Sequence, residues 1–291
     1  MKTILHTFAI ISFILIGSSF SQPDASNYYE SGLNSLNDQD YIKAIGDFTN
    51  AIALNGKNGD AYYQRAYAKE LLGNKMGFFS TDLCGDLVLA MMNGKKDAAR
   101  KLNTLCMGEC FDMDGAFIDP ESVYCADFSS KILTDLPNEM DRLSFVVKLN
   151  LFNNKVPTLS TKWAAMDQLI SLDLSSNRLS LIPPVLGKLT HLEELNLNKN
   201  MIPTLPAEVG HLKSLKKLTM RQNALTTLPV EFCELEHLEQ LDLAMNTLTA
   251  LPANIGNLKN LKQLTLVGNE IPAKEQQRIK AALPNTQIFF E

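Results

Sequence analysis

The sequence has no excess of positive charge. Its 291 residues contain 27 Lys and Arg against 32 Asp and Glu, which gives a formal net charge of -5 at pH 7. The basic residues are scattered along the chain rather than clustered. A protein that binds phosphate backbones needs a concentrated basic surface. The composition therefore argues against nucleic acid as a partner.

The sequence also lacks the short motifs that accompany common enzyme chemistry. It contains no phosphate-binding glycine loop ending in Lys-Ser or Lys-Thr, no HExxH and no GxSxG. Three histidines follow the N-terminal segment, and we expect His191, His211 and His237 to be solvated surface residues. We therefore predict that the protein is not an enzyme and has no cofactor.

One segment comes close to a calcium-binding loop. From Cys110, the pattern C-x-D-x-D-G-x-x-x-x-x-E places Asp112 and Glu121 at calcium-loop spacing. However, Cys110 stands where the first ligand should be Asp, and Pro120 interrupts the expected second helix. We therefore interpret residues 111–122 as an acidic linker and predict no metal site.

No apolar run is long enough to span a membrane. The longest, residues 4–16, has 13 residues, whereas a spanning helix needs roughly 20. Lys2 precedes this run and small residues close it before Gln22, which is the pattern of a secretory signal peptide. We predict that residues 1–21 are removed on export. The mature chain would then have no membrane span and would be periplasmic or extracellular.

What the sequence has in abundance is leucine at fixed spacing. The frame L-x-x-L-x-L-x-x-N is illustrated by Leu192 to Asn200, which read LEELNLNKN. The Asn of the frame recurs every 23 residues, at Asn154, Asn177, Asn200, Asn223, Asn246 and Asn269. Such a constant step without insertions indicates a repeat architecture.

This frame, with a second apolar column often followed by Pro (Leu205-Pro206), resembles the 23-residue leucine-rich repeat. The resemblance covers residues 123–291 and implies an α/β solenoid, a horseshoe with short parallel strands on its concave face. Alternate leucines such as Leu195 and Leu197 would point inward, and the Asn residues would form a structural ladder that bonds the turn backbone. One coil cannot bury its leucines, so the stack needs several repeats and capped ends.

The repeat phase also predicts where the stack begins and ends. A degenerate first repeat is expected at 123–145, where Lys131 stands at the Asn position. Six repeats follow at about 146–272. A C-terminal cap is expected at 273–291, formed by a short helix and a final strand.

Residues 25–110 predict a different, all-α module. The run Tyr28-Tyr29-x-x-Gly32 and its continuation to Leu54 resemble a tetratricopeptide repeat (TPR), and the pattern begins again 34 residues later at Tyr62. The second copy then departs from the family spacing. We predict one regular repeat, one irregular repeat and a closing helix near 96–106. Both roles, peptide binding and N-terminal capping of the repeats, stay open.

Five cysteines in an exported chain imply disulfides with one cysteine left over. We favour Cys84 with Cys106 and Cys110 with Cys125, although four cysteines allow three connectivities. Cys233 falls in the core register of the repeats, and we expect it to be a buried free thiol.

The outward side chains of the strands provide candidate binding residues. An apolar patch edged by charge on a concave face is typical of a partner site, and the alternative is scatter on a repeat surface. The candidates are Phe152, Asn196, Asn198, Lys199, Arg221, Asp242, Ala244, Met245 and Val267.

The sequence thus predicts a non-catalytic, exported interaction protein. The resemblance implies a protein partner on the concave face, but a fold does not identify a ligand. The alternative is a structural scaffold or adaptor whose tetratricopeptide-like module or lateral surfaces bridge components of the cell envelope.

Overall fold

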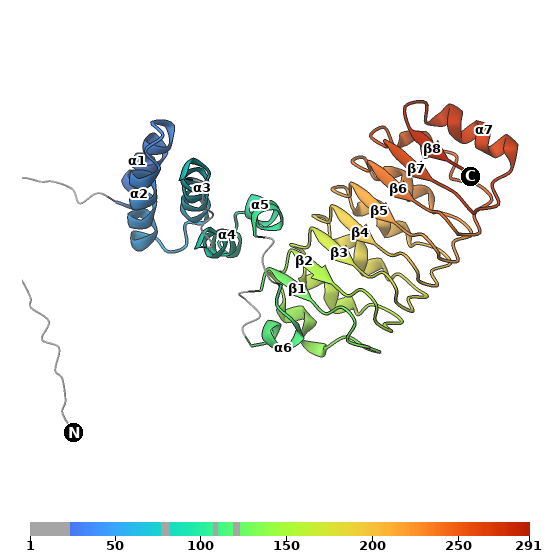
Figure 1. The fold of residues 1–291 in the computed structure, drawn as a ribbon, viewed down its shortest axis with the longest axis horizontal. Helices are drawn as coiled ribbons and strands as arrows, with labels where there is room; N and C mark the ends of the chain where they lie inside the picture. Colours follow the sequence, from blue (N-terminus) through green and yellow to red (C-terminus); the bar gives the residue numbers. More distant parts are fainter. Residues whose placement is uncertain (1–23, 77–81, 107–109, 119–122) are drawn as a thin grey trace, which may run out of the picture.

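The computed structural model describes residues 24–76, 82–106, 110–118 and 123–291, and the predicted signal peptide lies outside them. Along the chain, a group of helices is followed by a stack of coils, which is closed by a helix and a final strand (Figure 1). Within the described ranges, no helix is both long and apolar enough to cross a membrane.

In the described part of the chain up to residue 106, five α-helices pack one against the next in chain order. Asp24 and Asp40 cap the first two helices by accepting hydrogen bonds from the backbone N–H groups of Asn27 and Lys43. We call this group the helical module. Its members are α1 (Ala25–Asn37), α2 (Tyr41–Leu54), α3 (Gly59–Met76), α4 (Asp82–Met92) and α5 (Asp97–Leu105).

The stack, here called the repeat domain (residues 123–291), contains a parallel sheet of eight strands in chain order. Equivalent residues of successive coils pair directly, for example Leu172 with Leu195. This arrangement confirms the predicted α/β solenoid with short parallel strands on its concave face. The strands are β1 (Cys125–Asp127), β2 (Lys148–Asn150), β3 (Ser171–Asp173), β4 (Glu194–Asn196), β5 (Lys217–Thr219), β6 (Gln240–Asp242), β7 (Gln263–Thr265) and β8 (Gln287–Phe289).

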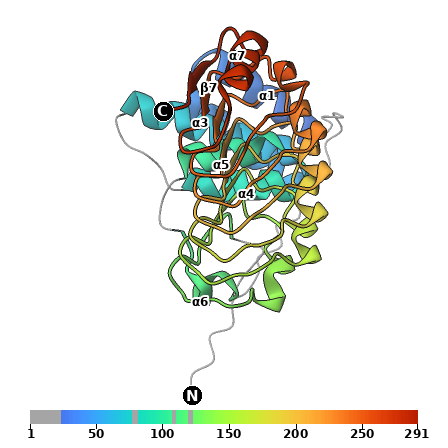
Figure 2. The same ribbon diagram turned by 90° about the vertical axis from the view of Figure 1, so that its right-hand side faces the viewer.

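Short 3-10 helices form the convex side of the coils and follow one another along one side of the stack in Figure 2. Glycine permits close packing there, because a Cβ atom on Gly210 would lie 2.4 Å from the backbone oxygen of Glu231. Cys233 replaces Gly in this column, and the next 3-10 helix is shorter. The helices are η2 (Asn138–Arg142), η3 (Thr161–Ala165), η4 (Pro184–Lys188), η5 (Ala207–His211), η6 (Val230–Glu234) and η7 (Ile255–Asn257).

The turn asparagines hold adjacent coils together. The side-chain nitrogen of Asn200 donates to the backbone oxygens of Leu174 (3.0 Å) and Leu197 (3.1 Å), and its oxygen accepts from the backbone N–H of Leu179 (2.9 Å). These bonds satisfy buried backbone groups that the strand ladder does not reach. Equivalent bonds are made by Asn154, Asn177, Asn223, Asn246 and Asn269.

The N-terminal end of the stack is covered by the segment predicted to be a linker. It contains α6 (Met113–Ala116), and Ala116 is fully buried against the repeat core. Asp112 caps this helix by accepting from the backbone N–H of Gly115 at 2.9 Å. The prediction of a simple acidic linker is therefore wrong, because apolar residues among the acids bury against the first coil. Glu121 of the calcium-like pattern lies outside the described residues.

The C-terminal end is covered by α7 (Ala273–Ala282) and by β8, which extends the sheet beyond β7. The guanidinium of Arg278 donates to Glu275 and to the backbone oxygen of Leu251, which fixes α7 to the last coil. Helix and strand thus shield the leucines that the last repeat would otherwise expose to water.

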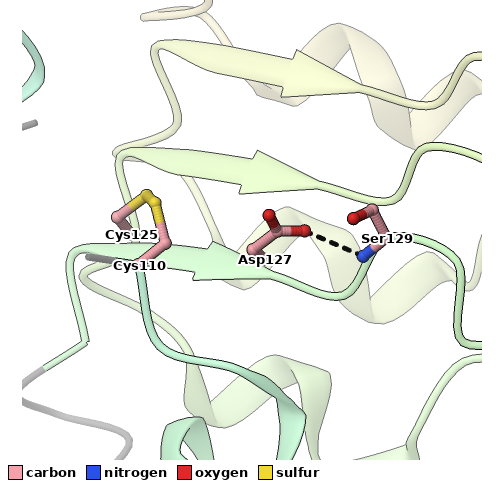
Figure 3. The surroundings of a disulfide bond; sticks show 4 residues. All are labelled: Cys110, Cys125, Asp127 and Ser129. Carbon is pink, nitrogen blue, oxygen red and sulfur yellow. Dashed lines mark hydrogen bonds between the residues drawn. A yellow bond between two sulfur atoms is a disulfide. The ribbon is translucent and has the colours of Figure 1, made fainter. Parts of the chain in front are cut away.

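The cysteines form the two pairs favoured by the sequence. Cys84 and Cys106 join α4 to the end of α5, with Cα atoms 5.8 Å apart. Cys110 and Cys125 join the covering segment to β1, with Cα atoms 4.8 Å apart (Figure 3). Cys233 is a buried free thiol, and burial raises its pKa to about 11.

We expect thiol titration to find no reactive group in the native protein, one after denaturation without reductant, and five after reduction. A raised pKa means that folding favours the protonated thiol, so this contribution to stability is complete below about pH 9 and is lost as the pH rises toward 11. The free energy of unfolding should therefore fall over that range in the parent more than in Cys233→Ala. Three or five thiols before reduction would contradict the two pairs.

Candidate functional site

The concave face is built by the period-two alternation of the strands. In β4, Leu195 points into the core while Glu194 and Asn196 point outward. A column of Asp and Asn side chains at the last strand position accepts from the backbone N–H two residues later, as Asp127 does from Ser129 in Figure 3. Its members are Asp127, Asn150, Asp173, Asn196 and Asp242.

The column is also cross-linked between coils. Asn196 donates to Asp173 at 3.0 Å and accepts from the hydroxyl of Thr219 at 2.9 Å. Beside this network lies a polar hollow of about 290 Å³. The side chains that line it come from three successive strands and the turn after β4, and the lining residues are Ser171, Leu172, Asp173, Glu194, Leu195, Asn196, Asn198, Lys217 and Thr219.

The predicted candidates differ in accessibility. Phe152 and Met245 are 43% and 44% exposed, and Lys199 and Arg221 are also exposed. Ala244 is fully buried, so its inclusion as a surface candidate is wrong: its single methyl group does not extend beyond its neighbours. The half-buried candidates are Asn196, Asn198, Asp242 and Val267.

The structure does not bring all the apolar candidates together. Phe152 follows β2, whereas Val267 follows β7. Five strand spacings of about 4.8 Å separate these positions by roughly 24 Å. Phe152 therefore lies toward one end of the face and the other accessible apolar candidates, Met245 and Val267, lie toward the other end, with Lys199 and Arg221 between them.

Among the outward residues of the hollow that the sequence did not single out are two of opposite charge, Glu194 and Lys217. Both occupy the first strand position, one residue before an inward leucine. The alternation that placed Asn196 on the face also places these charges on it. The structure sets the carboxylate and the ammonium group on adjacent strands at the wall of the hollow.

The helical module is docked beside this face through a column that the sequence did not reveal as an interface. Val147 and Ile170, immediately before β2 and β3, are 1% and 4% exposed and share an apolar cluster with α3, α4 and α5. In the next coils the same column carries charge instead, at Glu193, Lys216, Glu239 and Lys262. The change from apolar to charged residues was the available signal.

An ion pair marks the boundary of this docking. Arg100 of α5 lies 2.6 Å from the carboxylate of Glu193, which also accepts from Lys216 at 2.7 Å. Burial alone would raise the pKa of Glu193, but the hydrogen bonds from Lys216 and Arg100 outweigh it and hold the pKa below its ordinary value. The carboxylate is therefore charged at neutral pH and links the module to the repeat domain.

The fold and this surface define a leucine-rich-repeat solenoid with a docked helical module. A family model described as "Leucine-rich repeat region" matches residues 186–283, and one described as "Leucine Rich Repeat" matches residues 168–189. Leucine-rich-repeat domains generally mediate protein–protein interaction and are typically non-catalytic scaffolds.

Solved structures show the same fold. A Leptospira interrogans LRR protein is 35% identical, with a TM-score of 0.53, over 57% of this chain and 41% of that one. A TDR receptor is 25% identical, with a TM-score of 0.51, over 60% of this chain and 32% of the receptor. The chain thus spans less than half the length of either protein. No curated protein matches it.

Proposed function

We propose that this is a non-catalytic binding protein of the cell envelope or extracellular space that recognises a protein partner on the concave face. The observation that carries the proposal is the exposure of Phe152 and Met245 on a face that also presents Lys199 and Arg221. Among the described residues, neither cation takes part in an ion pair. Apolar anchors edged by available charge are typical of partner sites.

The proposed location rests on the N-terminal segment and on the cysteines. Residues 1–21 have the pattern of a signal peptide, and the two disulfides are compatible with an oxidising compartment. A periplasmic or extracellular site of action fits both observations.

The helical module supports a second candidate function. Its helices pack consecutively in chain order, and a Cβ atom on Gly32 would lie 2.5 Å from the ring of Phe48, which agrees with the tetratricopeptide-like interpretation of α1 and α2. Because the module docks on the flank of the first coils, the outer surface of α1 and α2 stays available to a second protein. In that case the chain would act as an adaptor between two envelope components.

A pull-down from envelope and culture extracts tests the proposal. We expect the parent protein to retain a partner that an Arg221→Glu/Val267→Asp variant loses, because the variant reverses a charge and places a carboxylate on the concave face. A matched Lys188→Glu/Val230→Asp variant makes the same changes at exposed convex positions and should retain the partner.

Both variants should keep the circular dichroism spectrum of the parent, since the four positions lie outside the buried core. Equal retention of the same proteins by parent and concave variant would assign the function to the helical module or to the adaptor role. Loss in the convex variant alone would place the partner on the other side of the stack.

A further inference from the structure

We infer that the concave edge at which the strands run into their turns binds an extended protein segment carrying both acidic and apolar side chains. This inference rests on the proposed function and specifies the chemistry of the partner. We call the surface the turn edge. It comprises the eight residues that follow each of the strands β1 to β5. These segments are 128–135, 151–158, 174–181, 197–204 and 220–227.

The turn edge has a charge opposite to that of the whole chain. Each of its five segments contains one cation, and the five together contain one acid, Asp135. All five cations are exposed, and within the described ranges none forms an ion pair with a carboxylate. The cations are Lys131, Lys155, Arg178, Lys199 and Arg221.

The opposite ends of the strands are organised differently. There, Glu193 pairs with Lys216 at 2.7 Å and Glu239 pairs with Lys262 at 2.6 Å, so the charges along that flank neutralise one another. Parallel strands place equivalent residues about 4.8 Å apart. The cations of the turn edge lie in neighbouring coils, at nearby but not identical positions of the repeat, and they have no such partners, so their fields add.

Exposed apolar side chains accompany these cations in the first four segments. Ile132 is 65% exposed, Phe152 43%, Leu181 57% and Met201 53%. Each lies within three residues of the cation in its own segment. Large apolar groups that face water and alternate with charge gain free energy when a partner covers them. The turn edge thus offers apolar contacts and positive charge in each of four successive coils.

The footprint has a defined length. The corresponding segments after β6 and β7, residues 243–250 and 266–273, contain no cation, and the second contains Glu270. Five coils span four strand spacings, or about 19 Å. An extended chain rises about 3.3 Å per residue, so a segment of roughly six residues covers the stripe.

The arrangement favours a protein segment over the other anionic partners. Phe152 and Arg221 occupy outward positions on the concave side, whereas Lys155 and Arg178 lie one residue beyond the turn asparagine. A flat bilayer cannot contact the residues inside the concave face and those beyond the turn asparagines at the same time, but a single extended chain can. A phosphate backbone would leave Ile132 exposed, and the net charge of the whole chain repels a long polyanion.

Selection from a displayed library of random peptides of about twelve residues tests the inference without a known partner. We expect the parent protein to enrich peptides that combine Asp or Glu with apolar residues. A reversal variant should lose this enrichment. It carries Lys155→Glu, Arg178→Glu and Lys199→Glu, and the matched control carries Lys188→Glu, Lys259→Glu and Lys274→Glu at exposed positions outside the turn edge.

Affinities of selected peptides provide the quantitative test. We expect the reversal variant to bind about tenfold or more weakly, since three exposed charge contacts each contribute a modest factor, and the control to bind within about twofold. Binding to the parent should also weaken as salt is added. Selected peptides without acidic enrichment, or equal binding by parent and reversal variant, would overturn the inference.

Two further results separate this inference from its alternatives. Retention on phosphatidylglycerol vesicles that the reversal abolishes, without enrichment of acidic peptides, would assign the edge to lipid instead. A natural partner that is lost by Arg221→Glu/Val267→Asp but retained by the reversal variant would keep the proposed function and remove this inference. Partner loss in both variants together with acidic peptide enrichment supports both.

Discussion

Replacing Cys84 and Cys106 with Ala is expected to lower the free energy of unfolding of the helical module by about 3 kcal/mol. The disulfide closes a loop with a sequence separation of 22, and releasing a loop of that size gives the unfolded chain entropy of this magnitude. The bridge also fixes α5 against α4, where Leu87 and Leu102 are buried. Without it, the module should unfold at lower urea concentration.

Two probes can follow the two parts of the protein separately. Far-UV circular dichroism is dominated by the helices, whereas Trp163, the single tryptophan, is 1% exposed in the repeat domain. We expect the dichroism transition to shift and the fluorescence transition to move less. Cys110→Ala/Cys125→Ala is the matched control. It breaks the link between the covering segment and β1 in the repeat domain, so it should shift mainly the transition that Trp163 fluorescence reports. An unchanged dichroism midpoint would show that the Cys84–Cys106 bridge does not stabilise the module.

Asn200→Ala is expected to lower the free energy of unfolding by about 1 to 3 kcal/mol. Asn200 is 8% exposed, and its loss leaves the backbone N–H of Leu179 without the acceptor that the side chain supplies. The backbone oxygens of Leu174 and Leu197 fare better, because each also accepts from the Asn of an adjacent coil. Sharing of carbonyls along the ladder therefore moderates the cost.

Gln240→Ala is the matched control for this prediction. It also removes an amide, but from an exposed strand position, and should change stability by less than about 0.5 kcal/mol. Urea unfolding followed by Trp163 fluorescence measures both variants. Equal midpoint shifts would mean that the buried amide contributes no more than an exposed one, contrary to its assigned role.

The regular part of the fold could be predicted because each repeat has the same pattern of apolar residues and Asn. The 23-residue spacing of residues such as Leu172 and Leu195 sets the strand register, and the paired residues follow it directly. Because the same pattern is found in every coil, an unclear assignment in one coil does not change the predicted register of the others. The segment before β1 has no repeat phase, and its role as a cover was missed for that reason.

The surface was less predictable than the core. Alternation shows which side chains face outward, but it does not show how far they extend or what they bond. Ala244 faces outward yet is fully buried, and the side chain of Asn196 hydrogen-bonds to Asp173 and Thr219 of the neighbouring strands. Exposure depends on the length of neighbouring side chains in adjacent coils. These neighbours are 23 residues away in the chain.

The sequence by itself determined the solenoid, its strand register and the asparagine ladder, because these depend on short patterns that recur in phase, whereas it left three connectivities open for the four cysteines that pair. Only the tertiary structure decided where the helical module docks and which charges remain unpaired. Val147, Ile170 and the five cations of the turn edge are scattered along the chain. Stacking the coils brings successive strands to within about 4.8 Å of one another, and this proximity gathers residues from separate repeats into one surface.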